Sequence, residues 1–362
     1  MDLALSDDQR MLAESARAFV ERWCPPARVR QIAADPLGHD PELWRAMASL
    51  GWAGLPIADT HGGSGGGVLE LAVLCEALGR GPVPSPIVVS TTLAALPIAW
   101  AGHDEQRDTW LPALSSGEAI GSLALVEPGG HDEWDEPGLH GGPALRGTKL
   151  LVPWAGTADV LLVDTVDGLH LVELRRGGTT SERHDDLGAD PLFVVELCDA
   201  PAEPLGAGGR EGHVPVLRRA LDCAAVVQLA YVVGAAERAL EMTVQHACDR
   251  HQFGRPIGSF QAVAHRCVDM RTDLDACRYL AYRAAWALDR GGPADLEVAA
   301  AKAYGNESLR RILVHAHQVH GAIGFSTEHD LHLFTRCAKS FELSYGSTTR
   351  HLDRVATTMG LG

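Results

Sequence analysis

The sequence predicts a mostly α-helical protein with a small β domain in its middle, so that helices, strands and helices follow one another along the chain. Apolar residues recur at three- and four-residue spacing before about residue 115 and again after residue 208, which is typical of helices with one buried face. Between these parts, short apolar runs broken by Gly, Pro and Asp have the length and β-branched content of strands. We therefore expect an N-terminal helical domain over 1–115, a central β barrel or sandwich over 116–208 and a C-terminal four-helix bundle over 209–362.

The N-terminal part opens with a helix start signal. Ser6 and Gln9 can form a capping box, in which both side chains satisfy backbone groups at the helix end, and Pro25 stops that helix after about Trp23. Further helices are expected over 41–50, 69–78 and 91–101. The glycines at 62–67 cannot propagate a helix, so this stretch is expected to be a loop.

Three long helices are expected in the C-terminal part, over 214–250, 259–290 and 294–320, followed by a shorter one. The second carries an apolar stripe made of Phe260, Val263, Cys267, Met270, Leu274 and Cys277. Long helices joined by short turns pack as antiparallel neighbours, which predicts the bundle.

The charge balance limits the classes of ligand. The chain carries 31 basic and 47 acidic residues, for a formal charge of -16. This argues against a general nucleic-acid or anionic-membrane binder, because such proteins need a dominating basic face, and a phosphate-bearing ligand would have to meet a local basic patch. The eight cysteines form no CxxC pair and are expected to be reduced core thiols. With no signal peptide or spanning helix at the N-terminus, we expect a cytoplasmic protein with no membrane attachment.

The strongest local motif joins the first two long helices, over residues 250–261. Arg250 at a helix end, followed by a Gly turn, can offer its guanidinium to a pyrophosphate, while Phe253 supplies a stacking surface. On physical grounds alone, the favoured interpretation is a plain turn in which the Arg250 charge interacts favourably with the helix dipole.

The run Arg250-His251-Gln252-Phe253-Gly254-Arg255-Pro256-Ile257-Gly258 followed by Phe260-Gln261 resembles the signature of the acyl-CoA dehydrogenase family, and similar segments occur at 50–80, 123–130 and 318–325. The resemblance implies FAD held between subunits. It assigns the adenosine diphosphate end to Arg250, Gln252, Phe253 and Gln261 of one subunit and to Gln318, Gly321 and Gly324 of its neighbour. It assigns the isoalloxazine edge to Val126 and Glu127, a further cofactor contact to Ser347, and a substrate contact to Gly346.

The sequence departs from the family pattern near the flavin. The loop after the 123–130 segment is altered at Gly129, Gly130, His131 and Asp132. A usual Trp-x-Thr contact is replaced by Leu151, Val152 and Pro153, and a proline cannot donate the hydrogen bond that Thr would offer.

The catalytic base is the larger departure. Family members remove the α-proton of a CoA thioester with a carboxylate, usually a Glu before a Gly, 27 residues after the Gln of the glycine turn. That place is Tyr345 here, and the alternative place, 26 residues before Arg250, is Ala224. A tyrosine is a poor base, since an ordinary pKa near 10 costs about 4 kcal/mol of deprotonation at neutral pH. The backbone N–H at this place, which hydrogen-bonds the thioester carbonyl in the family, survives any substitution.

Other polar residues are expected to be ordinary. Asp222 and Glu342 lie near the two places but are interpreted as solvated charges. Lys302, Arg310 and Arg311 are interpreted in the same way, with the alternative that one of them meets CoA phosphates. His315, His317 and His320 have no acidic partner at ligand spacing, so no metal site is expected.

Three hypotheses follow for function. The chain could be a base-lacking subunit of a heteromeric acyl-CoA dehydrogenase, like those of actinobacterial steroid side-chain degradation. It could instead be a homomeric FAD enzyme whose base is Tyr345, Asp222 or another group, or a non-redox binding protein on the same fold. The first two imply an acyl-CoA thioester, an electron-transfer flavoprotein or similar acceptor, and a homo- or heterotetramer with a second acyl-CoA dehydrogenase-like chain.

Overall fold

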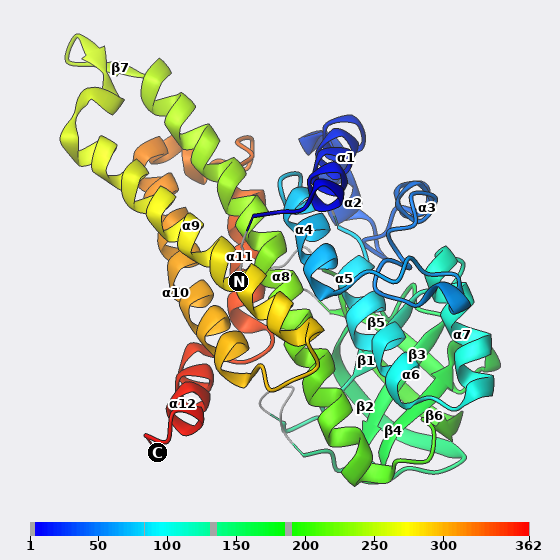
Figure 1. Ribbon diagram of the computed structural model, residues 1–362. Helices are drawn as coiled ribbons and strands as arrows, with labels where there is room; N and C mark the ends of the chain where they lie inside the picture. Colours follow the sequence, from blue (N-terminus) through cyan, green and yellow to red (C-terminus); the bar gives the residue numbers. More distant parts are fainter. Residues whose placement is uncertain (1–3, 83, 131–135, 185–189, 362) are drawn as a thin grey trace.

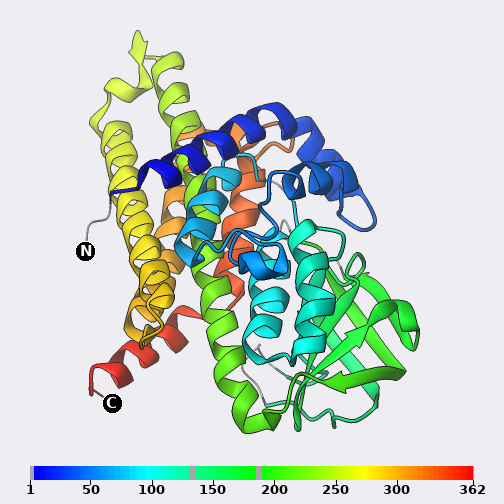
Figure 2. The same cartoon turned by 45° about the vertical axis from the view of Figure 1, so that its right-hand side comes forward.

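A computed structural model describes residues 4–82, 84–130, 136–184 and 190–361. Long C-terminal helices form one side of the molecule, and the N-terminal helices and a β sheet lie beside one another on the other side (Figure 1). The turned view shows the same arrangement, with the longest helix, α8 (Gly209–Asp249), running between the two sides (Figure 2). The order of helices, strands and helices agrees with the prediction.

The N-terminal helices are short and buried on their inner faces. They are α1 (Asp7–Trp23), α2 (Pro26–Ala34), α3 (Pro41–Ala48), α4 (Val68–Gly79), α5 (Ile87–Val89), the π-helix η2 (Ser90–Ala95), α6 (Leu96–Ala101) and α7 (Asp104–Ser116). The Ser6–Gln9 capping box forms as predicted, and α1 ends at Trp23. Both faces of η2 are buried, between the sheet and α8.

The central strands form one nearly closed sheet. The strands β1 (Gly121–Ala124), β3 (Val160–Thr165), β4 (Gly168–Glu173), β6 (Leu192–Pro204) and β2 (Ala144–Pro153) follow in that spatial order, and β5 (Thr179–His184) also pairs with β6. Among the strands that the structure describes, β1 and β3 are the only pair that runs in parallel. A register shift between Lys149 and Val152 bends the end of β2, which is the part that reaches the site described below.

The C-terminal bundle consists of α8, α9 (Gln261–Asp289), α10 (Asp295–His320) and α11 (Leu331–Leu343), with α12 (Thr348–Thr358) packed against α10. Helix α8 is long and apolar enough to cross a membrane, but 94% of its most apolar window is buried inside the fold. It is therefore the core helix of the bundle. The short strands β7 (His251–Gln252) and β8 (Arg255–Pro256) form a tip that projects beyond the main body (Figure 1).

Two expectations about burial are corrected. In the predicted stripe of α9, Met270, Leu274 and Cys277 are buried, whereas the first turns extend past the other helices and leave Phe260, Val263 and Cys267 only half-buried. Cys198 and Cys248 are exposed rather than core thiols. Cys198 lies on the outward-facing side of β6, and Cys248 lies on the last turn of α8.

Candidate functional site

The structure brings several predicted site residues to one cavity of about 90 Å³. The cavity lies where the ends of β1 and β2 meet η2, α8 and the segment between α11 and α12. Its wall is mostly apolar, and it is lined by Val89, Leu93, Leu123, Leu125, Val126, Leu150, Leu151, Pro153, Asp190, Leu192, Leu221, Ser340, Ser344 and Tyr345. The predicted flavin-edge segment, the altered 151–153 segment and the expected base position are therefore neighbours.

The two expected base positions lie in or against one apolar cluster, and one of them lines the cavity. Tyr345 lines it, and Ala224 is fully buried on α8 in the same apolar cluster as Leu221, against which Tyr345 packs. Tyr345 has a φ of 58°, in the left-handed region that costs a non-glycine residue about 1–2 kcal/mol. Gly346, at φ 97°, is buried beside it, and Ser347 caps α12 by accepting a hydrogen bond from the amide of Arg350. Neither position offers a carboxylate.

The β-domain wall of the cavity is shaped by backbone geometry. Leu151 also has a positive φ, of 53°, at the register shift of β2, and the amide of Leu150 donates to the carbonyl of Val126 over 2.7 Å. Val126 and Pro153 face the cavity with apolar side chains. His131 and Asp132 lie outside the described residues.

Glu127 is an internal anchor and does not line the cavity. Its carboxylate accepts hydrogen bonds from Nζ of buried Lys149 at 2.6 Å and from the amides of Gly138 and Leu139 at 3.0 and 3.1 Å. Burial alone would raise the pKa of Glu127, but the hydrogen bond and charge of Lys149 hold it below its usual range. Lys149 also donates to the carbonyl of Leu125, so this pair fixes the strand end that carries Val126.

Asp190 is a cavity residue that sequence reasoning missed. It is the only acidic residue among the described residues that line the cavity, and it accepts a hydrogen bond from the indole N–H of Trp154 at 3.2 Å. It precedes β6 in a loop, at neither of the positions found by counting from the motifs. The available sequence signal was an acidic residue that precedes Pro191 and an apolar strand. No neighbouring residue in the sequence indicates that this acid lies near Tyr345.

The residues predicted for the adenosine diphosphate end lie elsewhere, at the projecting tip. Arg250 ends α8, Gln252 lies on β7, and Gln261 begins α9. Phe253 has a φ of 54° and is 93% exposed, so packing within the chain does not explain an aromatic side chain there. The glycine that follows it has open space where a Cβ would be.

Gln318, Gly321 and Gly324 lie at the same end of the bundle as the tip. The ring of His246, four residues before Arg250, stacks on that of His320 with 4.6 Å between centroids. Gly321, at φ 65°, faces open space, whereas Gly324 is buried against His320. One chain therefore places both sets at the same end of its bundle, and the expected division of the two sets between neighbouring subunits stays a prediction.

Asp222 is not a solvated charge. It is buried on α8 and accepts two hydrogen bonds of 2.7 Å from the guanidinium of Arg354 on α12, which also contacts Asp295 on α10. Burial raises the pKa of Asp222 and Arg354 opposes that rise. The sequence could not show this, since the two partners lie 132 residues apart. Glu342 is half-buried and pairs with Lys339.

Lys302 is also buried, contrary to expectation. Its Nζ donates to Oδ1 of Asn306 at 2.5 Å and to the carbonyl of Phe341 at 2.8 Å. It faces inward because α10 is covered by both α11 and α12 at this level. Arg310 and Arg311 lie farther along α10 and pair with Glu307 and Asp273.

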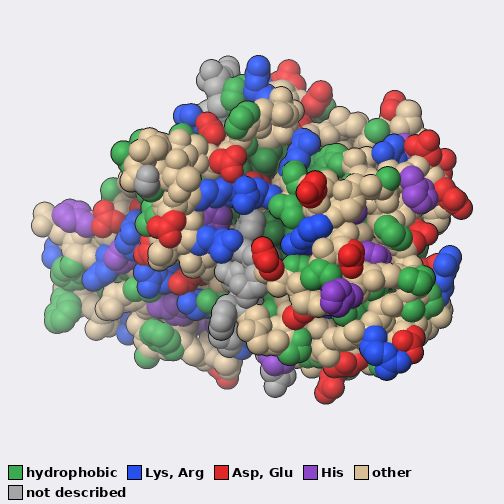
Figure 3. Space-filling model, turned by 90° about the horizontal axis from the view of Figure 1, so that it is seen from below, with side chains coloured by type: hydrophobic (Ala, Val, Ile, Leu, Met, Phe, Trp, Pro, Cys, Tyr) green, Lys and Arg blue, Asp and Glu red, His purple; other side chains and the backbone are tan. Residues whose placement is uncertain are grey.

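A local basic patch exists beside the site. A cleft of about 310 Å³ between α8 and α12 is lined by Arg218, Asp295, Arg350, His351, Arg354, Thr357 and Thr358. The space-filling view from below shows several Lys and Arg side chains near the middle of the molecule, with Asp and Glu side chains among them (Figure 3). Within the described parts of the chain, no group of three or more His, Cys, Asp or Glu side chains could hold a metal ion.

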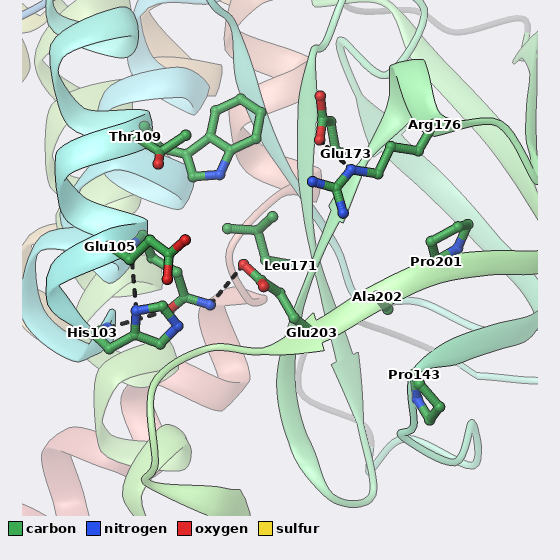
Figure 4. A pocket seen from close by; sticks show the side chains of 12 residues that line it. His103, Glu105, Thr109, Pro143, Leu171, Glu173, Arg176, Pro201, Ala202 and Glu203 are labelled. Carbon is green, nitrogen blue, oxygen red and sulfur yellow. Dashed lines mark hydrogen bonds and ion pairs between the residues drawn. The ribbon is translucent and has the colours of Figure 1, made fainter.

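Another cavity, of about 290 Å³, lies between α7 and the sheet (Figure 4). Three glutamates line it, and Gln106 bridges its wall by hydrogen bonds to Glu203 and to the carbonyl of Pro204. It shares no lining residue with the Tyr345 cavity, and its acidic lining is unsuited to a phosphate-bearing ligand.

Comparison with known proteins agrees with these features. Residues 6–118 match the family "Acyl-CoA dehydrogenase, N-terminal domain" and residues 214–360 match "Acyl-CoA dehydrogenase, C-terminal domain". The chain is 30% identical to acyl-CoA dehydrogenase FadE27 of Mycobacterium tuberculosis, with 98% of each chain covered. It is similar to the solved ChsE4-ChsE5 complex from M. tuberculosis, with 29% identity, a TM-score of 0.90 and all of both chains covered. It is also similar to PigA with FAD and proline, with 26% identity, a TM-score of 0.90 and all of both chains covered. The chain belongs to the acyl-CoA dehydrogenase family.

Proposed function

We propose that this chain is a subunit of a cytoplasmic, heteromeric acyl-CoA dehydrogenase, in which a second acyl-CoA dehydrogenase-like chain supplies the catalytic base. The observation that carries the proposal is that neither base position of the family holds a carboxylate: Tyr345 lines the cavity, and Ala224 lies in the apolar cluster against which Tyr345 packs. Family membership makes α,β-dehydrogenation of a CoA thioester the reaction, and the ChsE4-ChsE5 complex shows that two-chain assemblies occur among its relatives.

The residues present fit FAD as a ligand shared between subunits. Gly254 and Gly321 leave open space through which a pyrophosphate can approach the backbone closely, and Arg250 and exposed Phe253 lie at the same end of the bundle. The apolar wall formed by Val126 and Leu151 suits the face of a flat aromatic ring. Because the tip projects beyond the main body of its own chain (Figure 1), it is suited to reach the cofactor of a neighbouring subunit.

The chain's own groups bind and orient, and they do not abstract the proton. Bound FAD supplies a hydride acceptor for the β-carbon of the thioester. The amide of Tyr345 is the group that the family resemblance assigns to the thioester carbonyl, and the apolar cavity wall excludes water from it. Arg218 and Arg350, which line the cleft between α8 and α12, can meet the phosphates of CoA. An electron-transfer flavoprotein or similar acceptor then takes the electrons from the assembly.

The test is to prepare the chain alone and together with a base-bearing acyl-CoA dehydrogenase-like chain from the same organism. The flavin spectrum, the mass of the assembly and bleaching by an acyl-CoA are recorded for both preparations. We expect bleaching only from the mixed assembly. A yellow homotetramer that bleaches on its own would overturn the proposal, and two colourless preparations would favour a non-redox binding protein.

A second candidate function rests on Asp190. Because this carboxylate lines the same cavity as Tyr345, it could serve as the base of a homomeric enzyme. In that case the chain alone would dehydrogenate the thioester, and Asp190→Asn would abolish the reaction without releasing FAD.

A further inference from the structure

The backbone around Tyr345 is held in an uncommon conformation. Tyr345 and Gly346 both have positive φ values, of 58° and 97°, immediately before α12 begins. A non-glycine residue in this region persists only where its surroundings impose it. The peptide between Tyr345 and Gly346 must therefore be held in place by neighbouring groups.

His351 contacts this peptide directly. It lies on the first turn of α12, is 1% exposed, and places Nε2 2.8 Å from the carbonyl oxygen of Tyr345. Because a carbonyl can only accept, His351 must carry its proton on Nε2 and donate it. In the described part of the chain, its buried Nδ1 has no hydrogen-bond partner, so this single contact orients the ring.

A second buried group supports the next peptide. Nδ2 of Asn306 on α10 lies 3.5 Å from the carbonyl oxygen of Gly346, and Oδ1 of the same amide accepts from Lys302. Asn306 and Lys302 are both buried. Consecutive carbonyls, of Tyr345 and Gly346, are thus met by donors from two different helices.

Helix α12 is itself tied down one turn later. Arg354, three residues after His351, is paired with buried Asp222 on α8, two residues before Ala224. A residue at i+3 lies on the same face of a helix, so this pair fixes the position from which His351 reaches Tyr345.

We propose that His351 is a positioning residue, which holds the Tyr345–Gly346 peptide so that the amide of Tyr345 stays directed at the carbonyl of a bound thioester. The proposal rests on the proposed function, which makes this amide the carbonyl donor. It goes further in stating that this base-lacking chain keeps a working thioester-carbonyl subsite, and that a neutral histidine outside the cavity wall maintains it.

Burial, together with nearby positive charges, keeps His351 neutral. Burial, and then the nearby cations Lys302, Arg354 and Arg350, lower its pKa to about 4, against the opposing effect of the Tyr345 carbonyl. At physiological pH the ring is therefore a neutral donor suited to a carbonyl.

The test uses hydrogen–deuterium exchange of the full chain, assembled with its partner, and follows the segment 344–347. The probes are acetyl-CoA, whose acyl group is the smallest and makes the least demand on the cavity, and S-ethyl-CoA, the thioether that lacks the carbonyl. At matched saturation, acetyl-CoA should slow exchange of the wild-type segment about fivefold more than S-ethyl-CoA, as expected for one hydrogen bond. His351→Ala should remove this difference, and His351→Gln, whose amide can donate, should restore it.

Asp353→Asn, on the exposed face of the same helix, is the matched control and should behave as wild type. If His351→Ala unfolds the chain, His351→Met fills the space without a donor and serves instead. A carbonyl-dependent difference that persists in the donor-free variant overturns the positioning role and leaves the proposed function standing. A wild-type segment that responds equally to both probes overturns the carbonyl subsite. If neither probe protects any segment of the assembly, the proposed function fails as well.

Discussion

At the scale of single residues, the side chains nearest the expected base are apolar or already engaged. Tyr345 packs against the cluster that contains Ala224, and Asp222, the nearest acid on α8, is committed to Arg354. Asp190 is the one acid in the described cavity wall. These contacts make binding the natural role of this chain's cavity.

The pair of substitutions Tyr345→Phe and Asp190→Asn tests this role. Tyr345→Phe removes only a hydroxyl from a pocket-lining ring, and Asp190→Asn keeps an oxygen that can accept from Trp154. We expect the steady-state dehydrogenation rate of the mixed assembly to stay within about twofold of wild type in both cases, since changes outside the reacting groups cost little. A loss of several hundredfold in either variant would identify a catalytic group in this chain.

Counting along the chain predicted Tyr345 and Ala224 as the two base positions, and the structure packs Tyr345 against the apolar cluster that contains Ala224. Helix α8 runs without a break from Ala224 to the residue before Arg250, whereas η5 and a turn interrupt the segment between Gln318 and Tyr345. The same reasoning misjudged Asp222, since its partner is contributed by a helix 132 residues away. Asp190 was missed because loops carry no periodicity from which a direction could be inferred. Local sequence patterns therefore predicted the positions to inspect, whereas contacts between distant helices determine how the charged side chains are paired.

At the scale of elements, α12 depends on the ion pair between Arg354 and Asp222. Arg354→Leu would leave the buried carboxylate of Asp222 without its partner, and removing one member of a buried pair typically costs about 3–5 kcal/mol. We expect a clearly lower midpoint in urea unfolding. Arg310→Leu, on the exposed face of α10, is the control and should leave the midpoint near that of wild type. Equal midpoints for the two variants would show that α12 is held by other contacts.

The helical spacing of apolar residues predicted the three long helices, and Ser6 and Gln9 predicted the capping box of α1. The short apolar runs predicted the central strands. What they could not predict was the register shift in β2, which sets the positive φ of Leu151 at the cavity. A one-residue irregularity depends on the partner strand, and the alternation of one strand does not reveal it. The burial of Lys302 likewise depends on α11 and α12 covering α10.

At the scale of the whole molecule, buried histidines link stability to pH. The pKa of His351 is lowered to about 4, so between about pH 4 and 6.5 the unfolded chain binds a proton there that the folded chain does not. The stabilisation that neutral His351 gives to the folded state is therefore fully present above about pH 6.5 and is lost as the pH falls. On moving from pH 7 to pH 5, wild type should lose about 2 kcal/mol more unfolding free energy than His351→Gln. Parallel losses in denaturant titrations of the two proteins would contradict the assignment.

In the proposed assembly, this chain binds and orients the CoA thioester, and its partner removes the α-proton. The most direct measurement is anaerobic flavin bleaching by an acyl-CoA in the mixed assembly, with the partner's catalytic Glu changed to Gln and this chain left intact. We expect bleaching to fall to background, because neither Tyr345 nor Ala224 has a carboxylate that could replace the partner's Glu. Bleaching that retains half of the wild-type amplitude at an undiminished rate would show that this chain carries a base of its own.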